Sequence, residues 1–332
     1  MTERILITGG AGFIGSNFVH QTVREHSEFQ ITVVDAMTYA ANKDNLKGVE
    51  DQIDFVEGDI CNPGLMDDLV SKNDVVVNFA GESHVDNSLR DPDPFVHTNL
   101  LGVYSLLKAI RKYDRRLHHV STDEVFGDLP LESDERFTES TPYKPSSPYA
   151  ATKASADMLI AAWVRSFGLR ATVSMCANNY GPRQHVEKFI PRQITNILLG
   201  ERPKLYGAGA NIREWTHVDD HNAAVHAILS KGKEGETYII GAGEDAEAPN
   251  KQVMGLILEL MGQPEDAFDS VADRAGHDMR YATDTTKIRT ELGWRPRYTS
   301  LRDGLVETIK WYRDNVDYWR PQKQQTEERY GQ

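Results

Sequence analysis

The sequence predicts an α/β protein built on a doubly wound parallel sheet, with a smaller domain toward the C-terminus. Two observations carry this prediction: continuous apolar runs of strand length recur along the first half of the chain, and helical patterns separate them. A strand that is buried on both faces by crossover helices has a continuous rather than an alternating apolar sequence. The runs are residues 4–8, 30–35, 53–57, 75–80, 117–121 and 171–176.

The regular alternation fades beyond Tyr180. Shorter helical patterns are separated there by loops rich in Gly or Pro, such as 207–209 and 244–249. We therefore expect residues 1–178, with a returning segment near 215–243, to form the sheet domain, and residues 179–332 to form mainly a second domain. The two should pack closely, with a cleft at the carboxyl ends of the strands.

Composition restricts the partners and the compartment. The chain has 37 Lys and Arg against 50 Asp and Glu, a formal net charge of −13 at pH 7, which would repel nucleic acids and anionic membranes. The longest apolar stretches, such as 158–164, are too short to span a bilayer, and no signal-peptide pattern is present. Cys61 and Cys176 have no further Cys or His at metal-ligand spacing. We expect a cytoplasmic protein with two buried free thiols and no metal.

A G-x-x-G-x-x-G motif at residues 9–15 follows the first predicted strand and opens a helix that should end near Glu25. Glycines let the backbone turn tightly and approach a pyrophosphate, which N–H groups at the helix start can hold. Glycine-rich turns without a ligand also occur. However, Asp35 ends the second predicted strand, where a carboxylate can bind an adenosine ribose and repel a 2′-phosphate. The two features together predict a Rossmann-type domain that binds NAD rather than NADP.

Tyr149 and Lys153 lie early in a predicted helix, at positions i and i+4. This spacing places the phenol and the ammonium on one helical face, where a nearby cation can lower the pKa of the phenol. The pair alone would also fit an exposed helix start. Thr122 strengthens the catalytic interpretation because it ends the fifth predicted strand, at the edge where ligands bind in such sheets. Its hydroxyl could bond the oxygen that Tyr149 deprotonates.

These features resemble the dTDP-glucose 4,6-dehydratase family of the extended short-chain dehydrogenase/reductase superfamily, whose members act on nucleotide sugars. The similar segments span nearly the whole chain; they are residues 119–128, 146–149, 176–182, 187–191, 273–278 and 291–294. The adjacent carboxyls Asp123 and Glu124 are the most specific of them. A dehydratase needs an acid for a leaving hydroxyl and a base for a carbon-bound proton, and two carboxyls in different environments can divide these roles.

The resemblance implies a reaction and a set of contacts. Tyr149 would remove the proton of the sugar 4-hydroxyl, Glu124 would take the C5 proton and Asp123 would protonate the leaving 6-hydroxyl, while bound NAD accepts and returns the hydride. The implied NAD contacts are Gly9, Gly12, Phe13, Ile14, Gly15, Asp35, Ala36, Met37, Thr38, Asp59, Ile60, Ala80, Ser83, Thr98, Tyr149, Lys153 and Asn179. The implied substrate contacts are Ser83, Thr122, Asn178, Lys188, Phe189, Lys204, Tyr206, Arg213, Asn250, Arg274 and His277.

Other interpretations stay open at this level. They are a dehydratase for another nucleotide sugar, a UDP-hexose 4-epimerase, and a noncatalytic NAD sensor. The carboxyl pair argues against the epimerase, and the presence of Thr122, Tyr149 and Lys153 together argues against the sensor. Apolar residues on the predicted helices 104–113 and 154–167 suggest a homodimer formed through a helix bundle.

Overall fold

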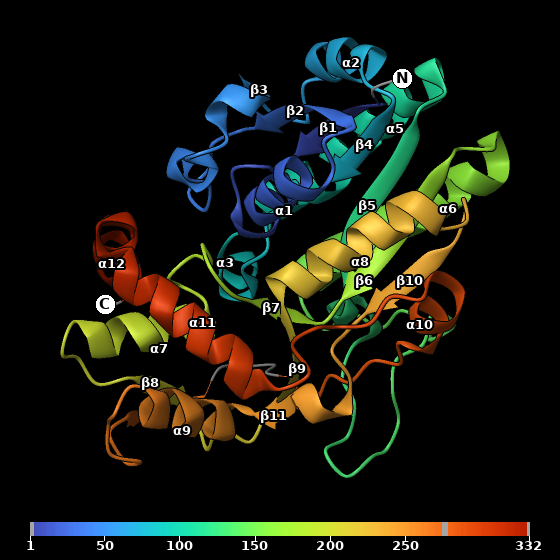
Figure 1. The fold of residues 1–332 in the computed structure, drawn as a ribbon. Helices are drawn as coiled ribbons and strands as arrows, with labels where there is room; N and C mark the ends of the chain where they lie inside the picture. Colours follow the sequence, from blue (N-terminus) through green and yellow to red (C-terminus); the bar gives the residue numbers. More distant parts are fainter. Residues whose placement is uncertain (1–2, 274–277, 331–332) are drawn as a thin grey trace.

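The computed structural model describes residues 3–273 and 278–330. Its largest element is a seven-stranded sheet in the order β10-β6-β5-β4-β1-β2-β3, with every neighbouring pair parallel. This confirms the predicted doubly wound sheet (Figure 1). The strands are β1 (Glu3–Thr8), β2 (Phe29–Asp35), β3 (Ile53–Glu57), β4 (Val75–Asn78), β5 (Arg116–Thr122), β6 (Ala171–Cys176) and β10 (Thr237–Ile240).

The strands differ from the predicted runs chiefly at two places. β4 ends at Asn78 rather than at Ala80, because Phe79 and Ala80 leave the sheet and line a cavity at its carboxyl edge. The strand β10 was not among the predicted strands, although it falls within the predicted returning segment 215–243. It pairs with β6 from Thr237 to Ile240 and closes that side of the sheet.

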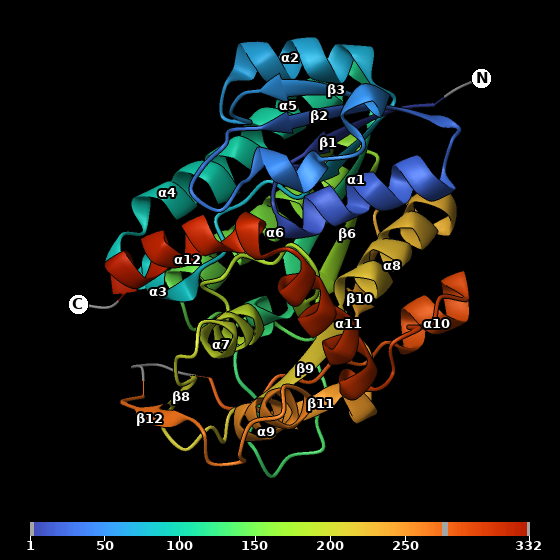
Figure 2. The same ribbon diagram turned by 60° about the vertical axis from the view of Figure 1, so that its left-hand side comes forward.

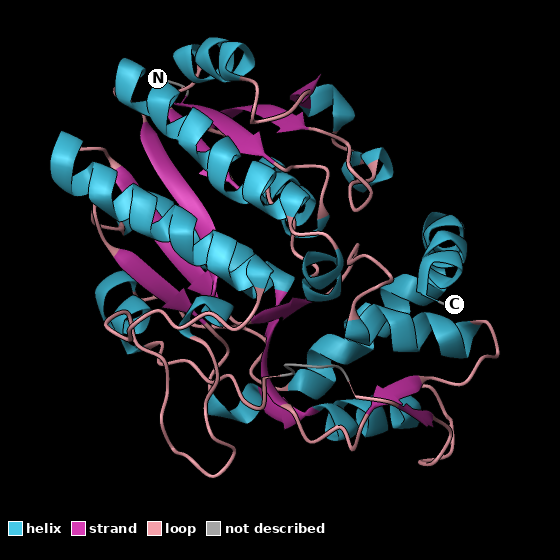
Figure 3. Cartoon of the chain, turned by 180° about the vertical axis from the view of Figure 1, so that it is seen from behind, coloured by secondary structure: helices cyan, strands magenta, loops and turns pink. Residues whose placement is uncertain are grey.

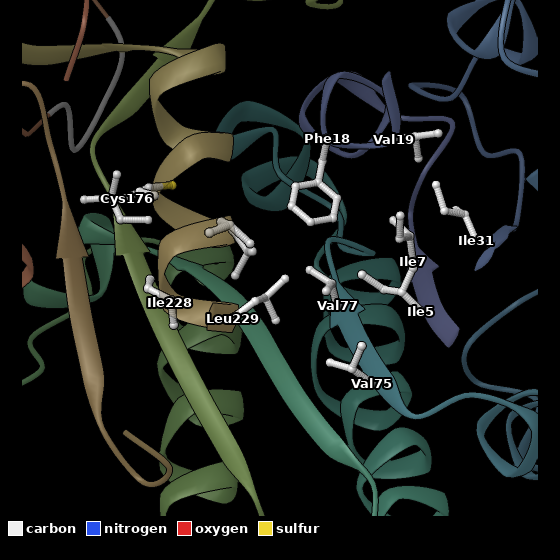
Figure 4. Close-up of a cluster of buried hydrophobic side chains, with 14 of the residues drawn as sticks. Ile5, Ile7, Phe18, Val19, Ile31, Val75, Val77, Cys176, Ile228 and Leu229 are labelled. Carbon is white, nitrogen blue, oxygen red and sulfur yellow. The ribbon is translucent and has the colours of Figure 1, made fainter. Parts of the chain in front are cut away.

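Helices cover both faces of the sheet, as Figure 3 shows from behind. On one face lie α1 (Phe13–Glu25) and α8 (Val218–Lys231), and on the other lie α2 (Pro63–Lys72), α5 (Val103–Tyr113) and α6 (Pro148–Phe167). In the close-up of Figure 4, Phe18 of α1 lies beside Val77 and Ile7, and Ile228 of α8 lies toward Cys176; all belong to one apolar cluster. These apolar contacts hold α1 and α8 against one face of the sheet.

A second lobe lies beyond that carboxyl edge (Figure 2). Its small sheet has the order β11-β9-β7, from β7 (Asn178–Tyr180), β9 (Ile212–His217) and β11 (Glu247–Pro249). Four helices, α7 (Phe189–Leu198), α9 (Asn250–Leu260), α11 (Leu301–Asp314) and α12 (Val316–Tyr330), share an apolar core with Tyr180, Trp215 and Trp319. β8 (Lys204–Tyr206) pairs with β12 (Asp269–Val271).

The remaining elements are short. They are α3 (Val85–Arg90), α4 (Asp93–Phe95), α10 (Thr286–Leu292), a π-helix η3 (Val96–Gly102), and the 3₁₀ helices η1 (Lys43–Leu46), η2 (Glu50–Gln52), η4 (Asp123–Phe126) and η5 (Glu244–Ala246). Across residues 3–273 and 278–330, we find no helix with the length and apolarity of a membrane span.

Candidate active site

The glycine motif forms a tight turn between β1 and α1. Gly9 has φ +69°, and a Cβ there would lie 2.6 Å from the backbone nitrogen of Ala80. A Cβ on Gly15 would lie 2.3 Å from the carbonyl oxygen of Gly9. No side chain caps α1 at its N-cap residue, Gly12, so the first N–H groups of the helix are available to an anion. The turn therefore has the construction that a bound pyrophosphate requires.

A cavity of about 220 Å³ lies over this turn. Most predicted NAD contacts line it: Gly9, Gly12, Phe13, Ile14, Gly15, Asp35, Ala36, Thr38, Asp59, Ile60, Ala80, Ser83 and Thr98. Four predicted contacts do not. Met37 packs against the core beside α1, Tyr149 and Lys153 are buried, and Asn179 lines a second cavity.

Asp35 is fixed at the rim of this first cavity. Its Oδ2 accepts a hydrogen bond from the N–H of Ala11 at 2.9 Å, and its Oδ1 accepts one from the N–H of Met37 at 2.9 Å. Burial nevertheless raises the pKa of the Asp35 carboxyl. Each carboxylate oxygen can accept a second bond, so the position suits a ribose with two free hydroxyls.

The second cavity, of about 400 Å³, lies between the two lobes. The predicted substrate contacts on its wall are Ser83, Asn178, Lys188, Phe189, Lys204, Tyr206, Arg213 and Asn250. Thr122 is buried and is not on that wall, and Arg274 and His277 lie outside the described residues. The guanidinium of Arg213 is oriented by the carbonyl oxygens of Ile212 and Asp278, each at 2.8 Å.

The two cavities adjoin. Ser83, Gln184, Glu187 and Lys188 line both of them. Ligands bound in the two cavities would therefore lie next to each other beside these shared residues. Direct hydride transfer between two bound molecules requires such an arrangement.

The end of β5 brings an acid pair to the second cavity. Thr122 is the N-cap of η4, and its Oγ1 accepts a hydrogen bond from the N–H of Glu124 at 3.3 Å. Asp123 is only 1% exposed, whereas Glu124 is half-buried and lines the second cavity. Burial, with a further contribution from the charge of Glu124, raises the pKa of Asp123 well above its ordinary value. Neighbouring carboxyls thus occupy different environments.

Tyr149 lies in the first turn of α6, which Ser147 caps by accepting the N–H of Ala150 at 3.1 Å. The expected lowering of the phenol pKa is wrong for this structure. Burial raises the pKa of Tyr149 well above its ordinary value, and a hydrogen bond with Thr122 lowers it only in part. The i, i+4 spacing indicated a nearby cation but not the degree of burial, which is the larger effect.

Lys153 is held in position by a buried polar network. Its Nζ donates to the carbonyl oxygen of Val120 at 2.7 Å and lies 3.3 Å from Nε2 of His119. Asp157, one turn further along α6, accepts a hydrogen bond from the Oγ of Ser121 at 2.6 Å and lies 3.7 Å from the His119 ring. Burial raises the pKa of Asp157 to about 6, while the charge of Lys153 lowers it.

Several polar atoms around the second cavity have no internal partner. Within the described part of the chain, Asp123 Oδ2, Asn178 Oδ1, Asn179 Oδ1 and Trp215 Nε1 are buried without a hydrogen bond. Such atoms cost free energy unless a ligand or water satisfies them. The donor and acceptor set therefore fits a polar ligand such as a sugar.

Sequence reasoning missed part of both walls. The additional residues include Ala40, Ala41, Glu82, His84, Asp86, Gln184, His185, Glu187, Arg192, Gln193 and Trp215. Glu187 immediately precedes the predicted contact Lys188, in a segment already similar to the family, and could have been found there. The others come from loops and helices that only tertiary packing brings to the cavities.

One group of potential metal ligands was not predicted. Asp59, Cys61 and His97 place one ligand atom each within 4.8 Å of one another. Asp59 already accepts the N–H of Cys61 at 2.8 Å, and the Cys61 thiol, half-buried rather than fully buried, has its pKa raised to about 12, chiefly by burial. A protonated thiol is a poor ligand, so the chemistry of this group does not favour a metal.

Comparisons with known proteins agree with this geometry. Residues 6–308 match the family model described as GDP-mannose 4,6 dehydratase. The chain is 59% identical over 327 residues to a dTDP-glucose 4,6-dehydratase of Mycobacterium tuberculosis, covering 98% of both chains. The chain belongs to the dTDP-glucose 4,6-dehydratase family. A member from Streptomyces niveus is 47% identical, with 96% of each chain covered.

Solved structures of the dTDP-glucose 4,6-dehydratase family have the same fold. The enzyme DesIV of Streptomyces venezuelae, crystallised with NAD and a second ligand, matches with a TM-score of 0.92 and 44% identity over 96% of this chain and 99% of that one. A UDP-glucose 4-epimerase of Thermotoga maritima matches with a TM-score of 0.87 and 29% identity, covering 94% of this chain and 99% of that one. The dehydratase family and the epimerase thus share an architecture, and the site residues must distinguish them.

Proposed function

We propose that this protein converts dTDP-glucose to dTDP-4-keto-6-deoxyglucose and water, with tightly bound NAD. The observation that carries the proposal is the carboxyl pair at the end of β5. Burial raises the pKa of the Asp123 carboxyl, which favours the protonated form that an acid requires, while Glu124 lines the second cavity, where a base must meet the sugar. An enzyme that only oxidises and re-reduces C4 needs no such pair.

The positions of the residues support the following roles in this proposal. Bound NAD supplies the hydride acceptor for C4 and the hydride donor for C6. Tyr149 removes the proton of the 4-hydroxyl, and Thr122, which is hydrogen-bonded to Tyr149, bonds the same oxygen. Glu124 removes the C5 proton, and Asp123 protonates the 6-hydroxyl as it leaves. As hydride returns to C6, the proton held by Glu124 returns to C5, and the proton taken from the 4-hydroxyl replaces the one that Asp123 gave to the departing water. The product therefore differs from the substrate by one water.

The cations on the second cavity support binding of a nucleoside diphosphate. Lys188, Arg192, Lys204 and Arg213 line it in a chain whose net charge is −13. Cations concentrated at one cavity of an acidic protein suit a diphosphate, and the fixed guanidinium of Arg213 offers oriented donors. The first cavity, with its glycine turn and Asp35, takes the NAD in this proposal.

Incubation of the purified protein with dTDP-glucose, without added cofactor, tests the proposal. A 4-keto product should form and should be detectable by mass spectrometry as a loss of water. Formation of an unchanged-mass C4 epimer would favour the 4-epimerase instead. Turnover of another nucleotide sugar in preference to dTDP-glucose would support the proposed reaction and contradict the proposed substrate.

We also propose a homodimer and a cytoplasmic location. The helices α5 and α6 expose large apolar side chains on one side of the sheet, including Tyr104 at 42%, Met158 at 55% and Phe167 at 46%. Exposed apolar surface of this kind is typical of a subunit contact. Both cysteines are free thiols, as in reducing compartments. Sedimentation of wild type against Met158→Glu would test the dimer.

A further inference from the structure

The segment 182–188 contributes residues to the walls of both cavities. Gln184, His185, Glu187 and Lys188 contribute to the wall of the first cavity, as do Thr38, Ala40 and Ala41, which follow β2. We name residues 182–188 the cofactor strap. It belongs to the second half of the chain, but its hydrogen bonds connect it to the first half at three separate places.

The first attachment of the cofactor strap is to α1, the helix that follows the glycine turn. Asn17 donates from Nδ2 to the carbonyl oxygen of Pro182 at 2.9 Å and accepts at Oδ1 from Arg183 at 3.0 Å. Asn17 is buried, and its bond to Pro182 is shielded from water. The start of the strap is therefore fixed to the helix that faces the pyrophosphate position.

The second attachment is through Tyr39, four residues after Asp35. The Tyr39 hydroxyl donates to Oε1 of Glu187 at 3.0 Å and accepts from Nδ2 of Asn87, in α3, at 3.1 Å. The Tyr39 ring also packs edge-on against His185, with ring centroids 5.7 Å apart. Glu187 is buried, so this bond to a carboxylate lies in a medium where such bonds are strong.

The third attachment is at the shared wall of the two cavities. Lys188 donates from Nζ to the carbonyl oxygen of Ser83 at 2.9 Å. Ser83 itself lines both cavities. The end of the strap is thus attached beside the position where the two ligands would meet.

We propose that Tyr39 is a positioning residue that fastens the cofactor strap over the first cavity and thereby keeps NAD bound through successive turnovers. The loop after β2, with Thr38, Ala40 and Ala41, and the cofactor strap both line this cavity, and the Tyr39–Glu187 bond joins them directly. The need for such retention rests on the proposed function, in which the cofactor ends each cycle in its starting state. An oxidoreductase that releases its reduced cofactor would gain nothing from the bond.

Release of NAD measures the strap directly. Wild type and Tyr39→Phe are loaded with isotopically labelled NAD and mixed with excess unlabelled NAD, and the label that stays bound is followed by mass spectrometry. Tyr39→Phe should lose label about tenfold faster or more, the effect of removing one hydrogen bond to a charged group. Tyr113→Phe is the matched control. The Tyr113 hydroxyl, at the end of α5, bonds Asp67 of α2 at 2.9 Å, and neither residue lines a cavity described above. Tyr113→Phe should exchange like wild type.

A second readout separates positioning from general destabilisation. Tyr39→Phe and Tyr113→Phe should unfold at similar temperatures, and added NAD should restore the turnover of Tyr39→Phe without stimulating wild type. Asn87→Ala should also speed release, and its effect should not add fully to that of Tyr39→Phe, since both act on one hydroxyl. If Tyr39→Phe fails to fold, Asn87→Ala alone carries the comparison.

Wild-type exchange rates in both Tyr39→Phe and Asn87→Ala would overturn the proposal. The exchange uses no dTDP-glucose, so it is independent of the test of function. If Tyr39→Phe exchanges NAD faster than wild type but wild type does not turn over dTDP-glucose, the role of the cofactor strap is supported and the proposed function is wrong.

Discussion

Asp123 and Glu124 are neighbours in the chain, yet the first is buried at 1% exposure while the second lines the second cavity. The helical turn η4 produces this difference, because its Thr122 cap directs the two successive side chains to different surroundings. The same pair therefore offers a proton donor and a proton acceptor within one turn. Two predictions separate their roles.

Glu124→Gln should stop the reaction after C4 oxidation. Thr122, Tyr149 and Lys153 are untouched, so the first hydride transfer should still occur, but the C5 proton has no acceptor. Reduced nicotinamide should accumulate on the enzyme and be visible by absorbance, while net turnover falls by about 10²–10⁴-fold. Turnover near the wild-type rate would remove Glu124 from its role as the base.

Asp123→Asn should separate proton removal from elimination. Glu124 can still take the C5 proton, but the 6-hydroxyl leaves without an acid. In deuterated solvent we expect C5–H exchange to exceed product formation, with elimination slowed by about 10²–10⁴-fold. Nuclear magnetic resonance of recovered substrate measures the exchange. Equal losses of exchange and elimination would show that Asp123 serves both steps or neither.

Tyr149→Phe should abolish C4 oxidation while the fold persists, because the ring still packs and only the phenolic oxygen is lost. We expect turnover to fall by about 10²–10⁴-fold and no reduced nicotinamide to appear. Retention of more than about a tenth of wild-type turnover would require another base. An unchanged unfolding temperature is the control for the fold.

Asp157 should make stability depend on pH. Its pKa in the folded state is raised to about 6, above the value of about 3.9 for an unfolded Asp. Between these values the folded state holds the extra proton, so the free energy of unfolding decreases as pH rises from about 4 to about 6, by about 2–3 kcal/mol from this group. Urea unfolding of Asp157→Asn across this range should show a shallower decrease. Parallel curves for variant and wild type would contradict the assignment.

The sheet was predictable because most of its strands are buried and so form apolar runs. β6, which is buried throughout, matches its predicted bounds, and so does the more exposed β3. Short strands such as β7, with three residues, and β8 carry too few residues for a pattern. The glycine turn and Asp35 were predictable because local backbone requirements fix their residue types. Burial was not predictable from spacing, which is why the pKa of Tyr149 was placed on the wrong side of its ordinary value.

The rest of the site depends on long-range packing. Glu187 reaches the first cavity because Tyr39, far away in the sequence, bonds to it, and no local motif encodes that contact. Trp215 is directed to the second cavity by the pairing of β9 with β7, where it lies opposite Asn178. Such residues become visible only when the fold itself is known.

The direct continuation of β9 into α8 has a mechanical consequence. β9 ends at His217 in the small sheet, and α8 begins at Val218 on the face of the large sheet, while β7 pairs with β9 through Tyr180. Hinge bending between the lobes would have to distort β9 or α8 where they join, because this crossing contains no linker. Ligand entry should therefore involve small local rearrangements, and the small-angle X-ray scattering curves of free and saturated protein should superimpose.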